Sequence, residues 1–313
     1  MATIFTFSGQ GAQRPGMLAS LPDSRAVSDT LAQAADVLSC AMADLDSVEA
    51  LADTRSVQLA LTVVGVAAAR HLAAEGAPAD GAMGLSIGAW PAAVTAGVIE
   101  FEDALQLVAE RGRLMAEAFP SGYGMSAIIG LGEARVRALI AGAGGDEASL
   151  YVGNVNSDQQ IVVAGADAAL ATLADTAGRA GASRVQRLDM AVPSHCALLD
   201  APADALDDIA NKSASIEFRA PRLAYFSANA RRRLWQAAAI RDDLIYNMAR
   251  TVYWSASAAI AHESGFSLAV EMPPARVLTN LHPATDSPGE AVAVIDAGWH
   301  NAAALIRREA STA

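Results

Sequence analysis

A serine stands between two glycines in Gly84-Leu85-Ser86-Ile87-Gly88, and this segment strongly constrains the fold. The preceding stretch, Gly81 to Leu85, is short and apolar like a strand, and Ala89-Trp90 opens a helical pattern. A serine on a sharp strand-to-helix turn needs small neighbours so that its Oγ can stand clear of the backbone. The free N–H groups of the following helix can then serve a developing oxyanion. The segment predicts a nucleophile elbow, which suits acyl transfer through a serine ester.

Composition narrows the class of protein. With 313 residues, the chain can form two domains or one large domain that carries an insertion. A hydrophobic content of 53% with 18% charged residues argues against disorder. The longest apolar run, Leu59 to Ala69, is too short to span a membrane and is followed by Arg70 and His71. The N-terminus shows no secretory signal. The two cysteines, Cys40 and Cys196, are far apart in the sequence and are expected to be reduced and unpaired. We therefore expect a cytoplasmic protein.

The charge distribution limits the partners. A net charge of −12 at pH 7 opposes nonspecific binding to nucleic acid or to an anionic membrane. The dense basic cluster Arg231-Arg232-Arg233 is interpreted as a solvated loop after a strand, with a phosphate or an acidic partner as the alternative.

Short strands alternate with amphipathic helices outside the middle of the chain, which predicts an α/β domain. Strands are expected at Ile4 to Phe7, Gly81 to Leu85, Leu223 to Ser227, Leu268 to Glu271 and Val292 to Ile295. Helices are expected at Ser24 to Leu38, Val57 to Ala73 and Phe101 to Phe119.

The middle of the chain has a different order of elements, which begins after the glycine-rich joint Ser121 to Gly124. The order is strand (Met125 to Gly130), helix (Glu133 to Ala141), strand (Leu150 to Asn156), strand (Gln160 to Ala164), helix (Asp167 to Gly178) and strand (Ser183 to Met190). This β-α-β-β-α-β order predicts a ferredoxin-like unit. We therefore expect a large α/β domain of residues 1–122 and 192–313, with a ferredoxin-like subdomain of residues 123–191 inserted into it.

Arg111 lies in the middle of an apolar helix stripe. On a helical wheel, these residues fall within about 60° of it: Ala104, Leu107, Val108, Leu114, Met115 and Ala118. A buried guanidinium needs an anionic partner, because an unpaired buried charge is costly. The partner is either a structural Asp or Glu or the carboxylate of a bound substrate.

A serine nucleophile also needs a base. The histidines of the chain are His71, His195, His262, His282 and His300. His195 follows the inserted unit, where a chain returning to the main sheet borders a cleft, so it is the preferred candidate. His282 and His300 are weaker candidates that chain order alone leaves open, because ordinary hydrolases carry their histidine late.

Five segments together resemble the malonyl-CoA:acyl carrier protein transacylases. They are Phe7 to Gln13, Gly84 to Gly88, Arg111 to Met115, Tyr151 to Gly165 and Val192 to Leu198. The resemblance covers most of the chain, and it implies a hydrolase-like α/β domain with a ferredoxin-like insertion.

The resemblance implies a role for each matching residue. Ser86 would be the nucleophile, His195 the base and Arg111 the ligand of the malonyl carboxylate. The backbone N–H groups of Gln10 and Ile87 would form the oxyanion hole. It further implies malonyl-CoA as the substrate, a phosphopantetheine-like thiol on an acyl carrier protein as the acceptor, and no bound cofactor or metal.

Two positions depart from the family. Leu85 stands where a histidine usually precedes the serine, and Asn247 corresponds to a glutamine that orients the catalytic histidine. The segments Gln13 to Leu18, Leu21-Pro22 and Leu85 to Pro91 look most like the epsilon subunit of malonate decarboxylase. The carrier subunit of that enzyme bears its thiol on a phosphoribosyl-dephospho-CoA group.

Three alternatives remain beside the malonate decarboxylase interpretation. The first is a transacylase of fatty-acid or polyketide synthesis, and the second is a serine esterase. The third is a non-catalytic adaptor with the same fold, which only the departures at Leu85 and Asn247 favour.

Overall fold

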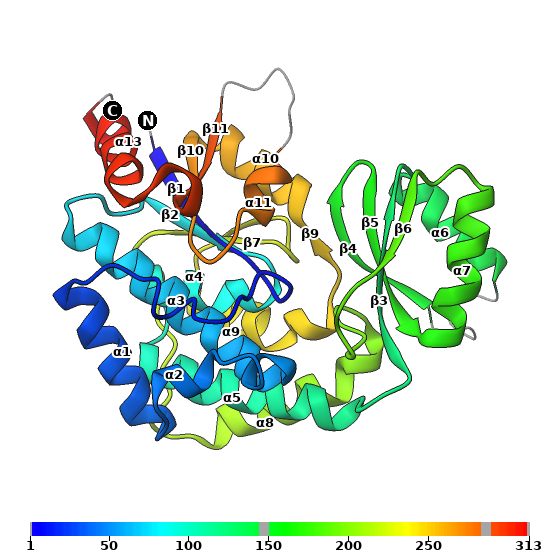
Figure 1. The fold of residues 1–313 in the computed structure, drawn as a ribbon, viewed down its shortest axis with the longest axis horizontal. Helices are drawn as coiled ribbons and strands as arrows, with labels where there is room; N and C mark the ends of the chain where they lie inside the picture. Colours follow the sequence, from blue (N-terminus) through cyan, green and yellow to red (C-terminus); the bar gives the residue numbers. More distant parts are fainter. Residues whose placement is uncertain (1, 144–149, 283–288, 312–313) are drawn as a thin grey trace.

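The computed structural model describes residues 2–143, 150–282 and 289–311, which form two β-sheets with surrounding helices (Figure 1). The larger sheet has the strand order β11-β10-β1-β2-β7-β8, and the smaller has β6-β3-β5-β4-β9. The larger sheet consists of β1 (Ala2–Phe7), β2 (Gly81–Gly84), β7 (Ala224–Ser227), β8 (Arg232–Leu234), β10 (Phe266–Glu271) and β11 (Glu290–Ala293). The smaller consists of β3 (Tyr123–Ile129), β4 (Leu150–Ser157), β5 (Gln160–Ala166), β6 (Arg184–Arg187) and β9 (Val252–Tyr253).

Helices cover both sheets (Figure 1). Around the larger sheet are α1 (Arg25–Leu38), α2 (Met42–Leu45), α3 (Thr54–Ala74), α4 (Ala89–Thr95), α5 (Phe101–Ala118), α8 (Asp200–Lys212), α9 (Ala237–Tyr246), α10 (Trp254–Glu263), α11 (Val277–Asn280), α12 (Val294–Ala297) and α13 (Trp299–Ser311). The smaller sheet carries α6 (Glu133–Gly142) and α7 (Asp167–Arg179). Short 3₁₀ turns are η1 (Ala50–Ala52), η2 (Ser86–Gly88), η4 (Ala197–Leu199) and η5 (Asn247–Ala249).

The larger sheet is parallel except for the antiparallel hairpin of β7 and β8. Alternate residues of β1 face opposite sides, as the pleat requires. Ile4 belongs to a cluster with residues of α10, whereas Phe5 and Phe7 belong to the main core with α3, α4 and α5. Helices on both faces of the larger sheet bury its central strands. This arrangement confirms the predicted α/β class.

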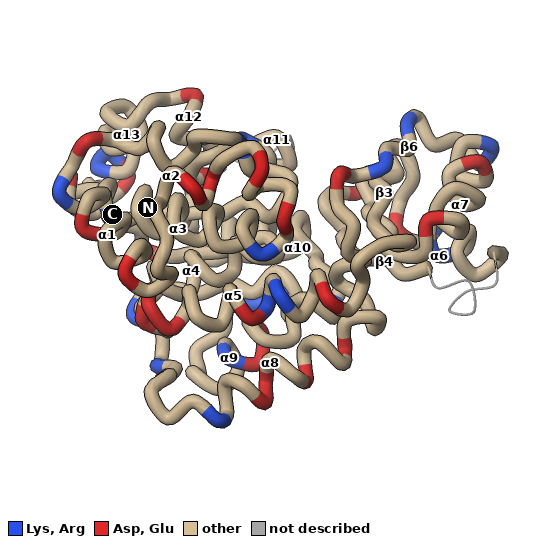
Figure 2. The backbone as a smooth tube through the Cα atoms, turned by 60° about the horizontal axis from the view of Figure 1, so that its bottom comes forward, with Lys and Arg blue, Asp and Glu red and all other residues tan. Residues whose placement is uncertain are grey.

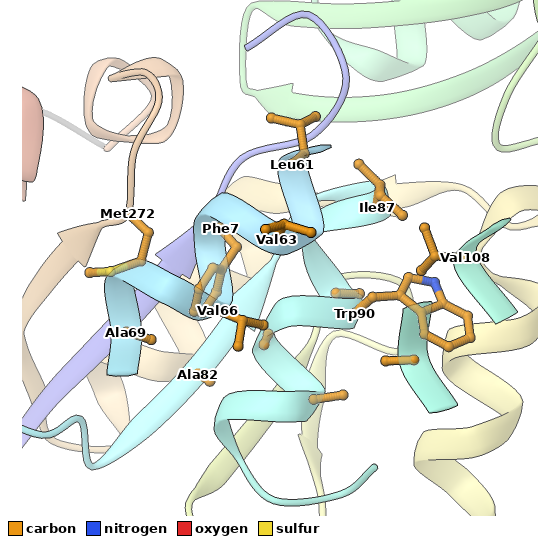
Figure 3. Packing of buried hydrophobic residues seen from close by; sticks show 14 of the residues in the cluster. Phe7, Leu61, Val63, Val66, Ala69, Ala82, Ile87, Trp90, Val108 and Met272 are labelled. Carbon is orange, nitrogen blue, oxygen red and sulfur yellow. The ribbon is translucent and has the colours of Figure 1, made fainter. Parts of the chain in front are cut away.

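Helix α3 forms the centre of the main core. Val63 and Val66 pack near Phe7, and Trp90 of α4 lies in the same cluster (Figure 3). By length and hydropathy alone this helix resembles a membrane span, but 83% of its most apolar window is buried inside the protein. Its apolar surface is therefore used for packing against other elements of the fold.

The smaller sheet has the ferredoxin-like strand order, with β3 between β5 and β6 and with α6 and α7 as its crossovers. Strand β9 is added to its edge and pairs in parallel with β4 through Asn154 and Val252. Because β9 follows α9 in the chain, the small sheet contains residues from outside 123–191. This pairing attaches the chain segment between α9 and α10 to the smaller sheet.

Three sequence expectations need correction. The run Val292 to Ile295 is not one strand, because β11 ends at Ala293 and Val294 begins α12. Strand β6 ends at Arg187, not at Met190; Leu188 makes one more backbone bond to Met125 of β3, and both Leu188 and Met190 line a cavity. Arg232 and Arg233 are not in a loop: they lie in β8, paired with Ser227 and Phe226 of β7.

Acidic residues are spread over several helices and recur along α8 (Figure 2). This distribution agrees with the net charge of −12. Among the described residues, no group of three or more His, Cys, Asp or Glu side chains is placed to hold a metal ion.

Candidate active site

The elbow around Ser86 depends on two close backbone approaches. Ser86 adopts a left-handed conformation with φ of 57°, which is unusual for a residue with a side chain. A Cβ on Gly84 would lie 2.0 Å from the carbonyl oxygen of Gly88, and a Cβ on Gly88 would lie 2.1 Å from the oxygen of Phe7. Only glycine fits at both positions, so the motif is a steric requirement of the turn from β2 into η2.

His195 contacts Ser86 directly. Its Nε2 lies 2.7 Å from the Ser86 Oγ, and its Nδ1 lies 2.6 Å from the carbonyl oxygen of Asn247. Because a carbonyl can only accept, Nδ1 carries the proton and Nε2 is free to accept one from Ser86. The backbone N–H of His195 donates to the carbonyl oxygen of Met248 at 2.6 Å. The 3₁₀ turn η5 therefore binds both the backbone and the imidazole ring of His195.

Arg111 of α5 is 1% exposed, and its hydrogen-bond partners are neutral amides. Its Nη1 donates to Gln58 Oε1 at 2.5 Å, and its Nη2 donates to Asn247 Oδ1 at 3.0 Å. The Nε has no partner among the described residues. Burial lowers the pKa of Arg111 to about 9, so the guanidinium is charged at neutral pH. This buried cation is thus bonded to no anion in the part of the chain that the structure describes.

Asn247 connects this cation to the elbow. Its Nδ2 donates to the backbone oxygen of Ser86 at 3.2 Å, while its Oδ1 accepts from Arg111. One residue therefore contacts three parts of the site, since its own backbone oxygen accepts from His195. The asparagine side chain, although shorter than that of glutamine, still reaches both Arg111 and Ser86.

The electrostatics of the site keep His195 neutral. Burial and the positive charge of Arg111 together lower the pKa of His195 to about 4. At neutral pH its Nε2 lone pair is therefore available as an acceptor. The arrangement can remove a proton from Ser86 over a wide pH range.

A cavity of about 220 Å³ opens in front of Ser86 and His195. It lies where the loop after β1, the small sheet and α11 meet. Its lining comprises Gly9, Gln10, Gly11, Ala12, Leu85, Ser86, Met125, Ala127, Asn154, Asn156, Gln160, Val162, Leu188, Met190, His195, Val277 and Leu281. Gln10 thus shares the cavity with Ser86, whereas Arg111 and its partner Asn247 are not among the lining residues.

A β-bulge aims two amides into this cavity. The register of β4 against β5 shifts between Val152 and Asn154, so Val152 packs against the helices of the small unit while Asn154 faces the cavity. Gly153 permits this, because a Cβ there would lie 3.0 Å from the backbone oxygen of Ser194. Asn154 and Asn156 are buried, and the Oδ1 of each has no partner in the described structure. Both oxygens are free to accept from a ligand.

The other sequence candidates lie elsewhere. His71 is buried in α3, with its Nδ1 3.0 Å from Ser24 Oγ. His262 and His282 line a separate small cavity, and His300 is exposed on α13.

Cys196 is buried beside His195, and burial raises the pKa of its thiol to about 12, which makes it a poor nucleophile.

Sequence reasoning missed two groups at this site. Gln58, which bonds Arg111, was visible as a polar residue at the start of the apolar stretch that forms α3. The inward amides Asn154 and Asn156 were not visible, because their direction depends on the bulge at Gly153.

Residues 4–302 match a family described as acyl transferase domain. The chain is 38% identical over 284 residues to the malonyl CoA-acyl carrier protein transacylase of Salmonella typhimurium, covering 88% of this chain and 90% of that protein. The Coxiella burnetii structure of the same name is 31% identical with a TM-score of 0.90, covering 98% of each chain. A malonyl-transacylase solved in complex with a type II PKS acyl-carrier protein is 34% identical with a TM-score of 0.88, covering 94% and 96%.

The lowered pKa of His195 predicts an unusual pH profile. The rate at which p-nitrophenyl acetate acylates Ser86, measured after brief pH jumps, should persist below pH 6.5 and fall with a midpoint of about 4. Protonation at lower pH removes the acceptor on Nε2. In Arg111→Ala the midpoint should move to higher pH, because the cation that disfavours imidazolium is gone. A wild-type midpoint at the ordinary value of 6.5 would contradict the assignment.

Proposed function

Because this chain belongs to the malonyl-CoA:acyl carrier protein transacylase family, whose members are acyltransferases, we propose that it transfers malonyl from malonyl-CoA to a carrier-protein thiol through an ester on Ser86. The observation that carries this proposal is the 2.7 Å contact between Ser86 Oγ and His195 Nε2 on a left-handed elbow. An intact contact of this kind disfavours a non-catalytic adaptor.

The reaction consists of two matched acyl exchanges. His195 Nε2 takes the hydroxyl proton as Ser86 Oγ attacks the thioester carbonyl. The backbone N–H groups of Gln10 and Ile87 stabilise the negative charge on the former carbonyl oxygen. The C–S bond then breaks, and CoA thiolate receives the proton from His195. The carrier thiol repeats these steps against the ester, giving its proton to His195, which returns it to the Ser86 oxygen as that oxygen leaves.

Arg111 selects a dicarboxylic acyl group. It is charged and buried, and its partners Gln58 and Asn247 supply amide oxygens without negative charge. A malonyl carboxylate would replace the Asn247 oxygen and compensate the guanidinium charge at close range. A neutral ester would leave this cation without an anion, which disfavours the esterase alternative.

The cavity in front of Ser86 suits the acceptor arm. Asn154 and Asn156 offer unpaired Oδ1 atoms, and Gln160 adds a third amide to the lining. A phosphopantetheine-like arm carries amide N–H groups that can donate to these oxygens and thereby guide its thiol toward Ser86. Filling the cavity with the arm also excludes water, which favours transfer over hydrolysis.

For the branch, we propose the malonate decarboxylase epsilon subunit, with the carrier subunit of that enzyme as the partner. The proposal rests on the segments Gln13 to Leu18, Leu21-Pro22 and Leu85 to Pro91. The competing branch, fatty-acid or polyketide synthesis, differs in the carrier and in its thiol arm. A cytoplasmic location stays a prediction from the sequence.

The nucleophile is tested by trapping the acyl-enzyme. Labelled malonyl-CoA without an acceptor should leave label on the peptide that contains Ser86, and Ser86→Ala should carry none. His195→Ala should slow labelling by about 10²–10⁴-fold, because it removes the base. Label on Cys196 would contradict the assignment.

Substrate selectivity is tested by Arg111→Ala. Malonyl transfer should fall by about 10²-fold, the scale for losing one partner of a buried charge pair, while acetyl transfer is retained. The matched control is Arg113→Ala on the exposed face of α5, where the arginine pairs with Glu110 and Glu117. Equal losses with both acyl groups, together with a lower melting temperature, would make Arg111 a structural residue.

The branch is tested by competition between two carriers. Both are supplied at equal concentration, one with a phosphoribosyl-dephospho-CoA thiol and one with ordinary phosphopantetheine. Preferential malonyl loading of the first supports the malonate decarboxylase assignment. Preference for the second would refute that assignment and leave the transacylase proposal standing.

A further inference from the structure

Glu271, at the end of β10, is a buried carboxylate that accepts from four donors. Its Oε1 accepts from Ser8 Oγ at 2.5 Å and from the backbone N–H of Leu278 at 3.0 Å. Its Oε2 accepts from the N–H and the hydroxyl of Thr279, at 2.7 and 2.8 Å. No ion pair to Glu271 is present among the described residues, so these hydrogen bonds satisfy its charge.

These bonds join two separate walls of the cavity. Ser8 begins the loop that follows β1, and Gln10 of that loop lines the cavity. Leu278 and Thr279 belong to α11, and Val277 of the same helix and Leu281 after it also line the cavity. One carboxylate therefore ties the loop of the proposed oxyanion hole to α11.

The same loop is pressed against the elbow from the other side. A Cβ on Gly9 would lie 2.9 Å from the backbone oxygen of Leu85, and a Cβ on Gly88 would lie 2.9 Å from the oxygen of Ser8. The loop is thus held between η2 and Glu271. The start of the loop is tied to the elbow, because the N–H of Leu85 donates to the carbonyl oxygen of Phe7 at 2.9 Å. The approaches of Ser8 and Gly9 to the elbow are steric and only prevent closer approach, so loss of the contact on the Glu271 side would let the part of the loop that carries Gln10 move away from Ser86.

We propose that Glu271 is a positioning residue for the reaction, which acts through Ser8 to hold the backbone N–H of Gln10 at the reacting carbonyl. This inference rests on the proposed function, because it assumes that Gln10 serves an oxyanion formed by attack of Ser86. Donors of this kind act on charge that develops only in the transition state, so their displacement lowers kcat more than it raises KM.

The protein contains a matched control for this contact. Ser227 is the buried last residue of β7, and Ser8 is the buried residue that follows β1. The Oγ of Ser227 donates to the buried carboxylate of Asp243 at 2.5 Å. Neither Ser227 nor Asp243 lines the cavity in front of Ser86. Ser8→Ala and Ser227→Ala therefore each remove a buried hydroxyl that donates to a carboxylate, and only Ser8 holds the proposed oxyanion loop. Ser227→Ala also removes the acceptor of the Ala230 N–H, which makes it the more disruptive of the two changes to its own surroundings.

The experiment compares kcat and KM for malonyl-CoA, acetyl-CoA and p-nitrophenyl acetate in the two variants. Ser8→Ala should lower kcat for all three by about 10-fold to 10²-fold, the scale for misplaced catalytic groups, with KM changed little. Ser227→Ala should lower the melting temperature and leave kcat within about twofold of wild type, since it touches no catalytic group. Ser8→Cys, which keeps a weak donor, should fall between wild type and Ser8→Ala.

Equal effects of Ser8→Ala and Ser227→Ala on kcat, or an effect of Ser8→Ala confined to KM, would overturn the inference. If Ser8→Ala does not fold, Ser8→Cys must still lower kcat with unchanged KM for the inference to stand. The p-nitrophenyl ester separates this inference from the proposed function. Wild-type protein that reacts with the ester at Ser86 but not with malonyl-CoA would refute malonyl transfer, while the loss of ester kcat in Ser8→Ala still decides the role of Glu271.

Discussion

The buried charge of Arg111 is the constraint to which the rest of the site is adapted. Its hydrogen-bond partners are the neutral amides Gln58 and Asn247, and its field helps to lower the pKa of His195 to about 4. In the proposed reaction, one cation thereby has two effects: it favours an anionic acyl group, and it keeps His195 unprotonated. Replacement of an amide oxygen by a substrate carboxylate would partly cancel that field and raise the basicity of His195 after the acyl group has bound.

The fold supplies this arrangement through a few backbone contacts. Gly84 and Gly88 allow the left-handed turn at Ser86, while η5 provides the carbonyl groups that hold His195. Strand β9 follows η5 and pairs with β4, whose bulge directs Asn154 into the cavity. The segment from η5 to β9 therefore contacts both His195 and the smaller sheet, so the cavity wall and His195 are positioned by the same segment of chain.

The α/β class and the ferredoxin-like unit were predictable, because periodicity and the order of elements depend on local sequence. Ser86 and Arg111 were visible for the same reason: one stands in a glycine motif and the other interrupts an apolar helix face. Contacts that depend on tertiary geometry were not visible. Glu271 is an ordinary residue at the end of a strand, and its four donors come from segments distant in the sequence or from a short helix. Strand β9 has two residues, too few for any pattern to predict.

The most direct test of the account is a structure of the protein with malonyl trapped on Ser86, for example in crystals of His195→Ala soaked with malonyl-CoA and frozen. The account predicts that the free carboxylate lies within hydrogen-bond distance of the Arg111 guanidinium and that the Asn247 side chain has moved from Nη2. A malonyl carboxylate directed to solvent, with Arg111 still bonded only to Gln58 and Asn247, would contradict it.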